Sequence, residues 1–135
     1  MIEVHDDATA DLKRIQLIDT DAFFKLVVFL QQLKKDPQLF SKLLDNDFGR
    51  DGTEVMSVMK WHGVHRIERV PIWRVKAWDL EKQGLKYRII YFYNWPDKTY
   101  NIMAIVKRDG FDYDDISHPI RQRVIKQVRK EFPKA

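Results

Sequence analysis

Cationic side chains recur on three β-prone runs in the second half of the chain. Arg74 and Lys76 lie two residues apart on the first run, Arg88 lies on the second, and Lys107 and Arg108 end the third. Alternation along a strand puts Arg74 and Lys76 on one face. A guanidinium offers paired donors to two phosphate oxygens and stays charged. The runs therefore predict a site that binds phosphate, provided that the three strands present their cations to the same face.

The distribution of charge also favours an anionic partner. The chain has a net charge of +4, yet residues 1–59 carry seven Lys or Arg against eleven Asp or Glu, whereas residues 60–135 carry seventeen against nine. RNA and DNA are common partners of such a surface, because each neutralised phosphate releases counterions. A solvated basic surface without a partner is the alternative that composition leaves open.

Helical periodicity and capping residues predict three helices in the first half of the chain. A short strand over residues 2–5 precedes them. The first helix begins at Asp7 or Thr9, the second at residues 19–20, and the third at Pro37, which fits a first helical turn. Residues 54–70 fit either a helix or a strand.

The three cationic runs are separated by turn residues and predict an antiparallel meander. A last helix starts at residues 117–119 and carries an apolar stripe, with Arg121 among the residues that we expect on its surface. The pattern predicts an α+β fold in one domain, 1–135. Its small antiparallel sheet has N-terminal helices packed on one face, a partly open second face and a C-terminal helix.

Other kinds of site are less well supported. The chain has no cysteine, which excludes disulfides and Cys-based zinc sites and is typical of a reducing cytoplasm. Its five glycines form no phosphate-binding loop, and His62 and His65 have no clear third metal ligand nearby. Serine residues are present, but none lies in a nucleophile motif. We therefore expect a soluble cytoplasmic protein with no metal, no cofactor and no membrane contact.

The cationic runs together resemble a known signature. Trp-Arg-Val-Lys on one strand, Tyr-Arg-Ile-Ile-Tyr on the next, and Lys-Arg ending the third before Tyr113 are similar to the RelE/ParE superfamily of type II toxin-antitoxin toxins. The similarity extends from about Lys60 to Tyr113 and includes the twenty-residue gap between Arg88 and Arg108. The longer helical region and residues 45–70 resemble the larger, HigB-like and phage-associated branch.

This resemblance implies a RelE-like fold and an mRNA endonuclease, commonly working on the ribosome, that inhibits translation. The family cleaves RNA without a metal, by attack of the 2′-hydroxyl on the adjacent phosphate, which leaves a 2′,3′-cyclic phosphate. Matching the motifs position by position implies a site with five residues: Arg74, Lys76, Arg88, Arg108 and Tyr113. The chain departs from the family pattern in a longer loop between Lys76 and Arg88, and in Asp114, which stands where a strict alignment puts the tyrosine.

The expected roles follow from side-chain chemistry. Arg88 and Arg108 would stabilise the charge on the phosphorane, and Lys76 would act as base or add positive charge. Arg74 would hold a phosphate, with Lys86 and Lys107 as further phosphate contacts. Tyr113 or His118 would move a proton to the leaving oxygen. His118 has the better reference pKa, but its place beside the last helix also suits a local role.

The resemblance also implies partners. A cognate antitoxin of the helix-turn-helix type would neutralise the toxin, and operator DNA would be bound only by the toxin-antitoxin complex. Messenger RNA and the ribosome would be the targets. Two alternatives remain open: a ParE-like toxin that inhibits DNA gyrase, and a basic nucleic-acid-binding module without activity.

Overall fold

The computed structural model describes residues 1–133 as an α+β fold; the last two residues of the predicted domain, 134 and 135, lie outside the described part. Five strands form one sheet, and the described residues contain six helices. The elements in chain order are β1 (Ile2–Val4), α1 (Asp6–Ile18), α2 (Thr20–Lys35), α3 (Pro37–Phe40), β2 (Met56–Lys60), α4 (His62–Glu68), β3 (Ile72–Ala77), α5 (Trp78–Lys82), β4 (Tyr87–Asn94), β5 (Thr99–Lys107) and α6 (Pro119–Glu131).

The three N-terminal helices begin close to their predicted capping residues. The Asp19 carboxylate accepts a hydrogen bond from the Ala22 amide at 3.0 Å and caps α2, as predicted. The cap of α1 was predicted wrongly, because His5 takes that position and its Nδ1 accepts from the Asp7 amide at 3.0 Å. An imidazole nitrogen serves here as the acceptor that a Ser or Asp oxygen commonly supplies.

The ambiguous stretch 54–70 contains both a strand and a helix. β2 pairs antiparallel with β3, with Met56 opposite Ala77 and Lys60 opposite Trp73. The chain then turns at Trp61 into α4. The sheet thus gains an edge strand that the alternation of residues did not indicate, and the meander β3-β4-β5 is confirmed beside it.

The strand order is β1-β5-β4-β3-β2, and the sheet is mixed rather than antiparallel. β1 lies parallel to β5, with Ile2 opposite Tyr100 and Val4 opposite Ile102, whereas all the other pairs are antiparallel. The prediction of a purely antiparallel sheet was therefore wrong. A three-residue strand at the chain's start carries too few residues to reveal which partner it joins.

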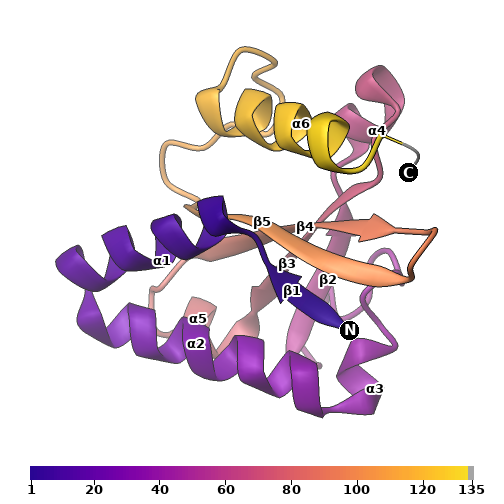
Figure 1. Cartoon of the computed structure of the whole chain (residues 1–135). Coiled ribbons are helices and arrows are strands. Elements are labelled where there is room, and N and C mark those ends of the chain that lie inside the picture. Colours follow the sequence, from indigo (N-terminus) through magenta and orange to yellow (C-terminus); the bar gives the residue numbers. More distant parts are fainter. Residues whose placement is uncertain (134–135) are drawn as a thin grey trace.

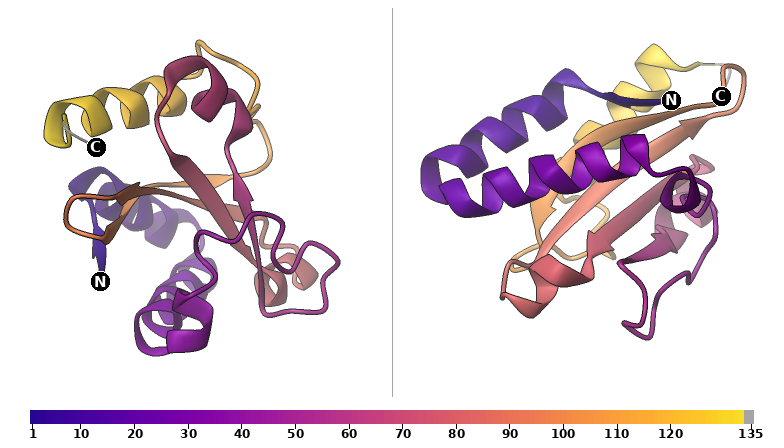
Figure 2. Two further views of the ribbon diagram at one scale, coloured as in Figure 1. Left: turned by 90° about the vertical axis from the view of Figure 1, so that its right-hand side faces the viewer. Right: turned by 90° about the horizontal axis from the view of Figure 1, so that it is seen from below.

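Helices cover both faces of the sheet (Figure 1). α1 and α2 pack on one face, over a core that includes Leu26, Leu33 and Ile89. α6 and α4 lie against the opposite face, where Ile90 and Phe92 belong to a second core (Figure 2). The predicted packing of the N-terminal helices is confirmed. The second face is more fully covered than we expected, and a cavity lies in the part beside β2 and β3.

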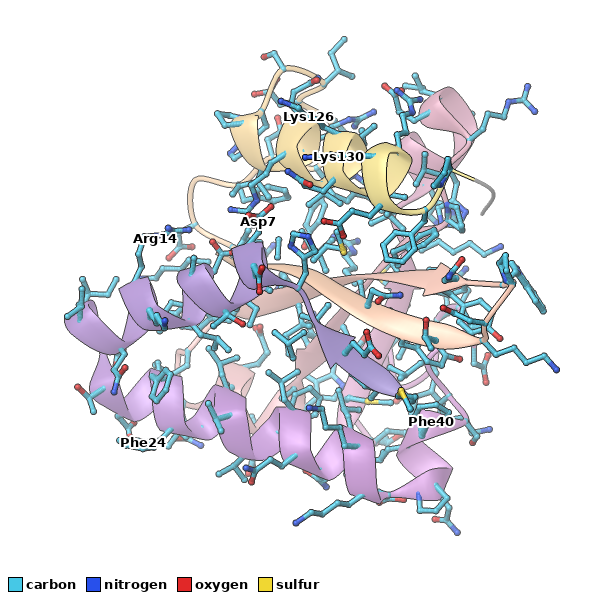
Figure 3. The ribbon with its side chains drawn as sticks, in the orientation of Figure 1. Asp7, Arg14, Phe24, Phe40, Lys126 and Lys130 are labelled. Carbon is cyan, nitrogen blue, oxygen red and sulfur yellow. The ribbon has the colours of Figure 1, made fainter. Side chains whose placement is uncertain are left out.

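A buried carboxylate joins the two layers of helices. Asp11 on α1 accepts a hydrogen bond from the Ile105 amide at 3.0 Å, beyond the point where β1 stops pairing with β5. Its oxygens also accept hydrogen bonds from Arg123 of α6 at 2.7 and 3.1 Å. The same guanidinium lies 3.7 Å from the carboxylate of Asp7, which Figure 3 labels at the start of α1. Asp11 therefore satisfies a strand amide that β1 is too short to reach and ties α1 to α6.

Replacing Asp11 with alanine is expected to lower the free energy of unfolding by about 3 kcal/mol, because it leaves the buried Ile105 amide without its acceptor and removes the nearer of the two carboxylates beside Arg123. Urea denaturation followed by circular dichroism measures the change. Lys13→Ala, at an exposed position of the same helix, is the control and should change stability by less than about 0.5 kcal/mol. Equal midpoints for both variants would contradict the role of Asp11.

No helix in the described residues is both long enough and apolar enough to cross a lipid bilayer.

Candidate active site

The pleat of the sheet brings the predicted cations to one face. Arg88 shares its side of β4 with Ile90 and Phe92, which belong to the core beneath α6. Arg74 pairs with Ile90 across β3 and β4, so its side chain points to the same face. Because α6 covers the sheet over β4 and β5, the cations lie in the part left open beside β2 and β3.

A cavity of about 500 Å³ opens at this place. It is lined by all five residues that the resemblance singled out: Arg74, Lys76, Arg88, Arg108 and Tyr113. Asp112 and Asp114 also line it, so the cavity is positive but not exclusively cationic. Three parts of the chain, β3, β4 and the end of β5, thus deliver these basic side chains to one hollow.

Arg88 is held rigidly in the wall of this cavity. Its side chain is 5% exposed and forms an ion pair with Glu81 of α5, while Nη1 also donates to the Tyr87 carbonyl at 3.1 Å. The sequence did not indicate Glu81 as part of the site, because residues 79–84 have the composition of a polar link between two strands. The carboxylate neutralises part of the guanidinium charge and fixes its plane. Arg88 can therefore offer a phosphate only the donors that Glu81 leaves free.

Lys76 is the basic group whose protonation the site perturbs. Burial lowers the pKa of its amine below the ordinary 10.5, and the positive charge of Arg88 lowers it further. Glu81 opposes this shift in pKa, whereas Arg108 and Arg74 add to it. The ammonium lies 4.4 Å from the centre of the Trp78 ring. Lys76 is thus more easily deprotonated than a solvent-exposed lysine.

Tyr113 contributes a hydroxyl without a partner. Its oxygen is buried and makes no hydrogen bond to any of the described residues, although the side chain lines the cavity. Burial raises the pKa of this phenol above 10.0, with the Arg74 charge acting in the opposite direction. The Arg74 guanidinium lies 4.0 Å from the centre of the tyrosine ring. The phenol therefore keeps its proton at neutral pH and has a free donor beside the cations.

The loop that carries Tyr113 is pinned through its backbone. The Tyr113 carbonyl accepts hydrogen bonds from Trp61 Nε1 at 2.9 Å and from Arg121 Nη1 at 3.1 Å. The tyrosine ring also packs edge-on against Trp61 and Phe111, with centroids 5.2 and 4.8 Å away. These contacts fix the phenol to both the β2–α4 junction and α6.

Arg121 corrects one of our predictions, because we expected it on the surface of the last helix. It is 1% exposed, and its guanidinium lies 5.7 Å from the centre of the Trp61 ring. Its Nε and Nη2 have no hydrogen-bond partner among the described residues. The spacing of three and four residues to Val124 and Ile125 was the available signal that this side chain faces the core.

Three predicted residues lie outside the cavity. Lys107 is the last residue of β5 and directly precedes Arg108. It lines a different hollow beside α1, because neighbouring residues of an extended chain point to opposite faces. Lys86 is exposed at the start of β4. His118 caps α6, where Nδ1 accepts from the Ile120 amide at 3.1 Å and the ring packs 4.6 Å from Phe111. The local role for His118 is therefore the one that the structure supports.

The cavity also includes residues that we did not predict. Phe111 and Asp112 come from the loop that carries Tyr113, and the others come from the stretch whose structure was ambiguous. They are Ser57, Met59, Lys60, Trp61, His62 and Gly63. The sequence could have indicated Lys60 among them, because it is a cation close in sequence to the strand that carries Arg74 and Lys76. Its position opposite Trp73 depends on a strand pairing that the sequence did not reveal.

Comparison with known proteins found no matching family model, no matching curated protein and no matching solved structure. The function must therefore be inferred from the cavity itself and from the resemblance carried by its residues.

Proposed function

We propose that this protein is a metal-independent endoribonuclease and that its α+β fold is a RelE-like toxin fold. The observation that carries this proposal is the convergence of Arg74, Lys76, Arg88, Arg108 and Tyr113 on one cavity. A basic hollow that holds an easily deprotonated amine and a protonated phenol has the groups that transesterification of RNA requires. Messenger RNA on the translating ribosome is the proposed substrate.

RNA supplies its own nucleophile in this reaction. The 2′-oxygen attacks the adjacent phosphorus while its proton passes to the neutral amine of Lys76. The bond from phosphorus to the 5′-oxygen then breaks, and the leaving oxygen takes the proton of the Tyr113 phenol. A 2′,3′-cyclic phosphate and a free 5′-hydroxyl result. The lowered pKa of Lys76 and the raised pKa of Tyr113 suit these opposite duties.

The arginines would act on charge rather than on protons. Arg108 is exposed in the lining of the cavity, and no described residue occupies its side-chain donors, so they are available for phosphate oxygens. Arg88 would meet the phosphorane from the wall, with its orientation fixed by Glu81. Arg74 stacks on Tyr113, so it would bind a phosphate oxygen and hold the phenol at the same time.

Replacing Tyr113 with phenylalanine is expected to lower the rate of RNA cleavage about 10²-fold, because the proton donor to the leaving oxygen is removed. Stability should be unchanged or slightly higher, since the deleted hydroxyl is buried without a partner among the described residues. Single-turnover cleavage and thermal denaturation measure the two effects. Tyr93→Phe, on the opposite face of the sheet, is the control. A Tyr113→Phe variant with full activity would remove the tyrosine from the mechanism.

An antitoxin is proposed as the natural inhibitor. A partner that covers the cavity with acidic side chains would neutralise the cations and exclude RNA. We propose a helix-turn-helix protein for this role, with operator DNA bound by the complex alone.

The proposed activity is tested by adding the purified protein to a translating extract and following the length of a reporter mRNA. We expect fragments to appear, with protein synthesis falling as they accumulate. DNA gyrase supercoiling is measured in parallel. Inhibited supercoiling with intact mRNA would replace the ribonuclease with a gyrase inhibitor.

A further inference from the structure

A second hollow adjoins the reaction cavity along α4. This second hollow, of about 560 Å³, is lined by Lys60, His62, Gly63, His65, Arg66 and Asp114. Lys60, His62, Gly63 and Asp114 also line the reaction cavity. The two hollows therefore adjoin, and we call the second one, which reaches Arg66, the α4 groove.

The α4 groove carries basic side chains that the described residues leave unpaired. Neither Lys60 nor Arg66 forms an ion pair with a described carboxylate, whereas nearby Arg129 of α6 is tied to Glu68 at 2.9 Å. The Lys60 ammonium lies 5.6 Å from the centre of the Trp73 ring, which holds it at the junction with the reaction cavity. Asp114 is the one carboxylate in the lining, so the groove keeps a net positive charge.

The two histidines of the groove have different environments. His65 is a structural residue: its Nε2 lies 2.7 Å from the Ile72 carbonyl, and its ring packs edge-on against Trp73 at 5.9 Å. Burial lowers the pKa of His65 below 6.5, so the ring is neutral and anchors α4 to β3. His62 is exposed and has a flat ring available at the point where the two hollows meet.

An RNA strand that reacts in the cavity must continue beyond it, because each nucleotide next to the cleaved phosphate carries another phosphate and another base. The α4 groove adjoins the cavity and supplies both kinds of contact that bind single strands, which are cations for the backbone and a flat ring for a base. The net positive charge of the groove attracts the phosphates of the strand, whereas an acidic surface would repel them.

We propose that the α4 groove binds the segment of single-stranded RNA that flanks the cleaved phosphate, with Lys60 and Arg66 on its backbone and His62 against a base. This inference rests on the proposed ribonuclease function for the identity of the strand. It adds a binding subsite that is separate from the groups that move protons, so its loss weakens binding and leaves the chemical step intact.

The test compares Arg66→Gln with Lys126→Gln, since Arg66 lines only the α4 groove and Lys126 lies on the outer side of α6, away from the sheet (Figure 3). Affinity for a 2′-O-methyl oligonucleotide, which cannot be cleaved, is measured by fluorescence anisotropy at several salt concentrations. Arg66→Gln should weaken binding about tenfold and lower the salt slope by about 0.7, the loss expected for one phosphate contact on a single strand. Lys126→Gln should change neither quantity.

Cleavage kinetics provide the second measurement. Arg66→Gln should raise KM for a long RNA about tenfold with kcat unchanged, and should cleave a dinucleotide as the wild type does. Wild-type affinity of Arg66→Gln for the oligonucleotide would overturn the subsite, as would an equal loss of kcat on both substrates. If the wild type cleaves no RNA, the proposed function fails, while the binding experiment still decides whether this groove holds a single strand.

Discussion

Replacing Lys76 with methionine is expected to lower the rate constant of RNA cleavage about 10³-fold, because the amine that accepts the 2′-hydroxyl proton is lost. The fold should tolerate the change. Burial and Arg88 lower the pKa of Lys76, so at neutral pH its charge is a cost to the folded state that methionine removes. This cost is relieved in the wild type as pH rises from the lowered pKa toward 10.5. Single-turnover kinetics and thermal denaturation measure the two effects.

Lys76→Arg separates a base from a simple positive charge. Arginine keeps the charge but does not give up its proton, so this variant should be as inactive as Lys76→Met if Lys76 is the base. Retained activity in Lys76→Arg would assign the residue to charge stabilisation instead. In the wild type, activity should rise with pH and level off below 10.5, since the pKa of the amine is lowered. Neither lysine variant should show this limb of the pH profile.

Replacing Arg108 with alanine is expected to lower cleavage between 10²- and 10³-fold, as the loss of one preorganised donor to a transition-state charge commonly does. Arg108 is exposed, so its removal leaves no buried partner uncompensated. Lys107→Ala is a closely matched control, because it removes the same charge from the adjacent position but from the opposite side of β5. Equal losses in the two variants would mean that the net charge of the surface matters and that the cavity does not.

Arg88 is a less decisive position for the same experiment. Its guanidinium is buried against Glu81, and an alanine there would leave that largely covered carboxylate, 11% exposed, without its partner. Breaking a buried pair in this way costs about 3 to 5 kcal/mol, so lost activity would report unfolding as well as lost chemistry. The ion pair that the sequence did not reveal thus moves the most informative arginine from Arg88 to Arg108.

The alternation of strand residues was sufficient to predict that Arg74 and Lys76 share a face, but not that Arg88 lies on the same face. The two-residue period of the pleat is a local rule that holds within one strand. The antiparallel pairing of β3 with β4 then places Arg88 on the same face. The same rule separates Lys107 from Arg108. We expected both residues at the phosphate site. The side of the sheet on which each one lies depends on the register of β5 with β4, and that register shifts at Ile90 and Tyr91.

The remaining parts of the site depend on contacts between segments far apart in the sequence. Glu81 of α5 pairs with Arg88 near the start of β4, whereas the sequence indicated only a polar link between two strands at this place. Arg121 is buried because its guanidinium contacts the Trp61 ring and the Tyr113 carbonyl, which belong to other parts of the chain. β1 joins β5 in parallel through three residues, a pairing set by tertiary packing rather than by pattern.

The chemistry of the RNA ends tests the central claim most directly. Fragments made by the wild type in a translating extract should carry 2′,3′-cyclic phosphates and 5′-hydroxyls, and Arg108→Ala should make at least 10²-fold fewer of them. End-specific ligation followed by sequencing measures both quantities. Fragments with 3′-hydroxyl and 5′-phosphate ends, or cyclic-phosphate ends formed equally by wild type and Arg108→Ala, would contradict the proposal that this cavity cleaves RNA through the 2′-hydroxyl.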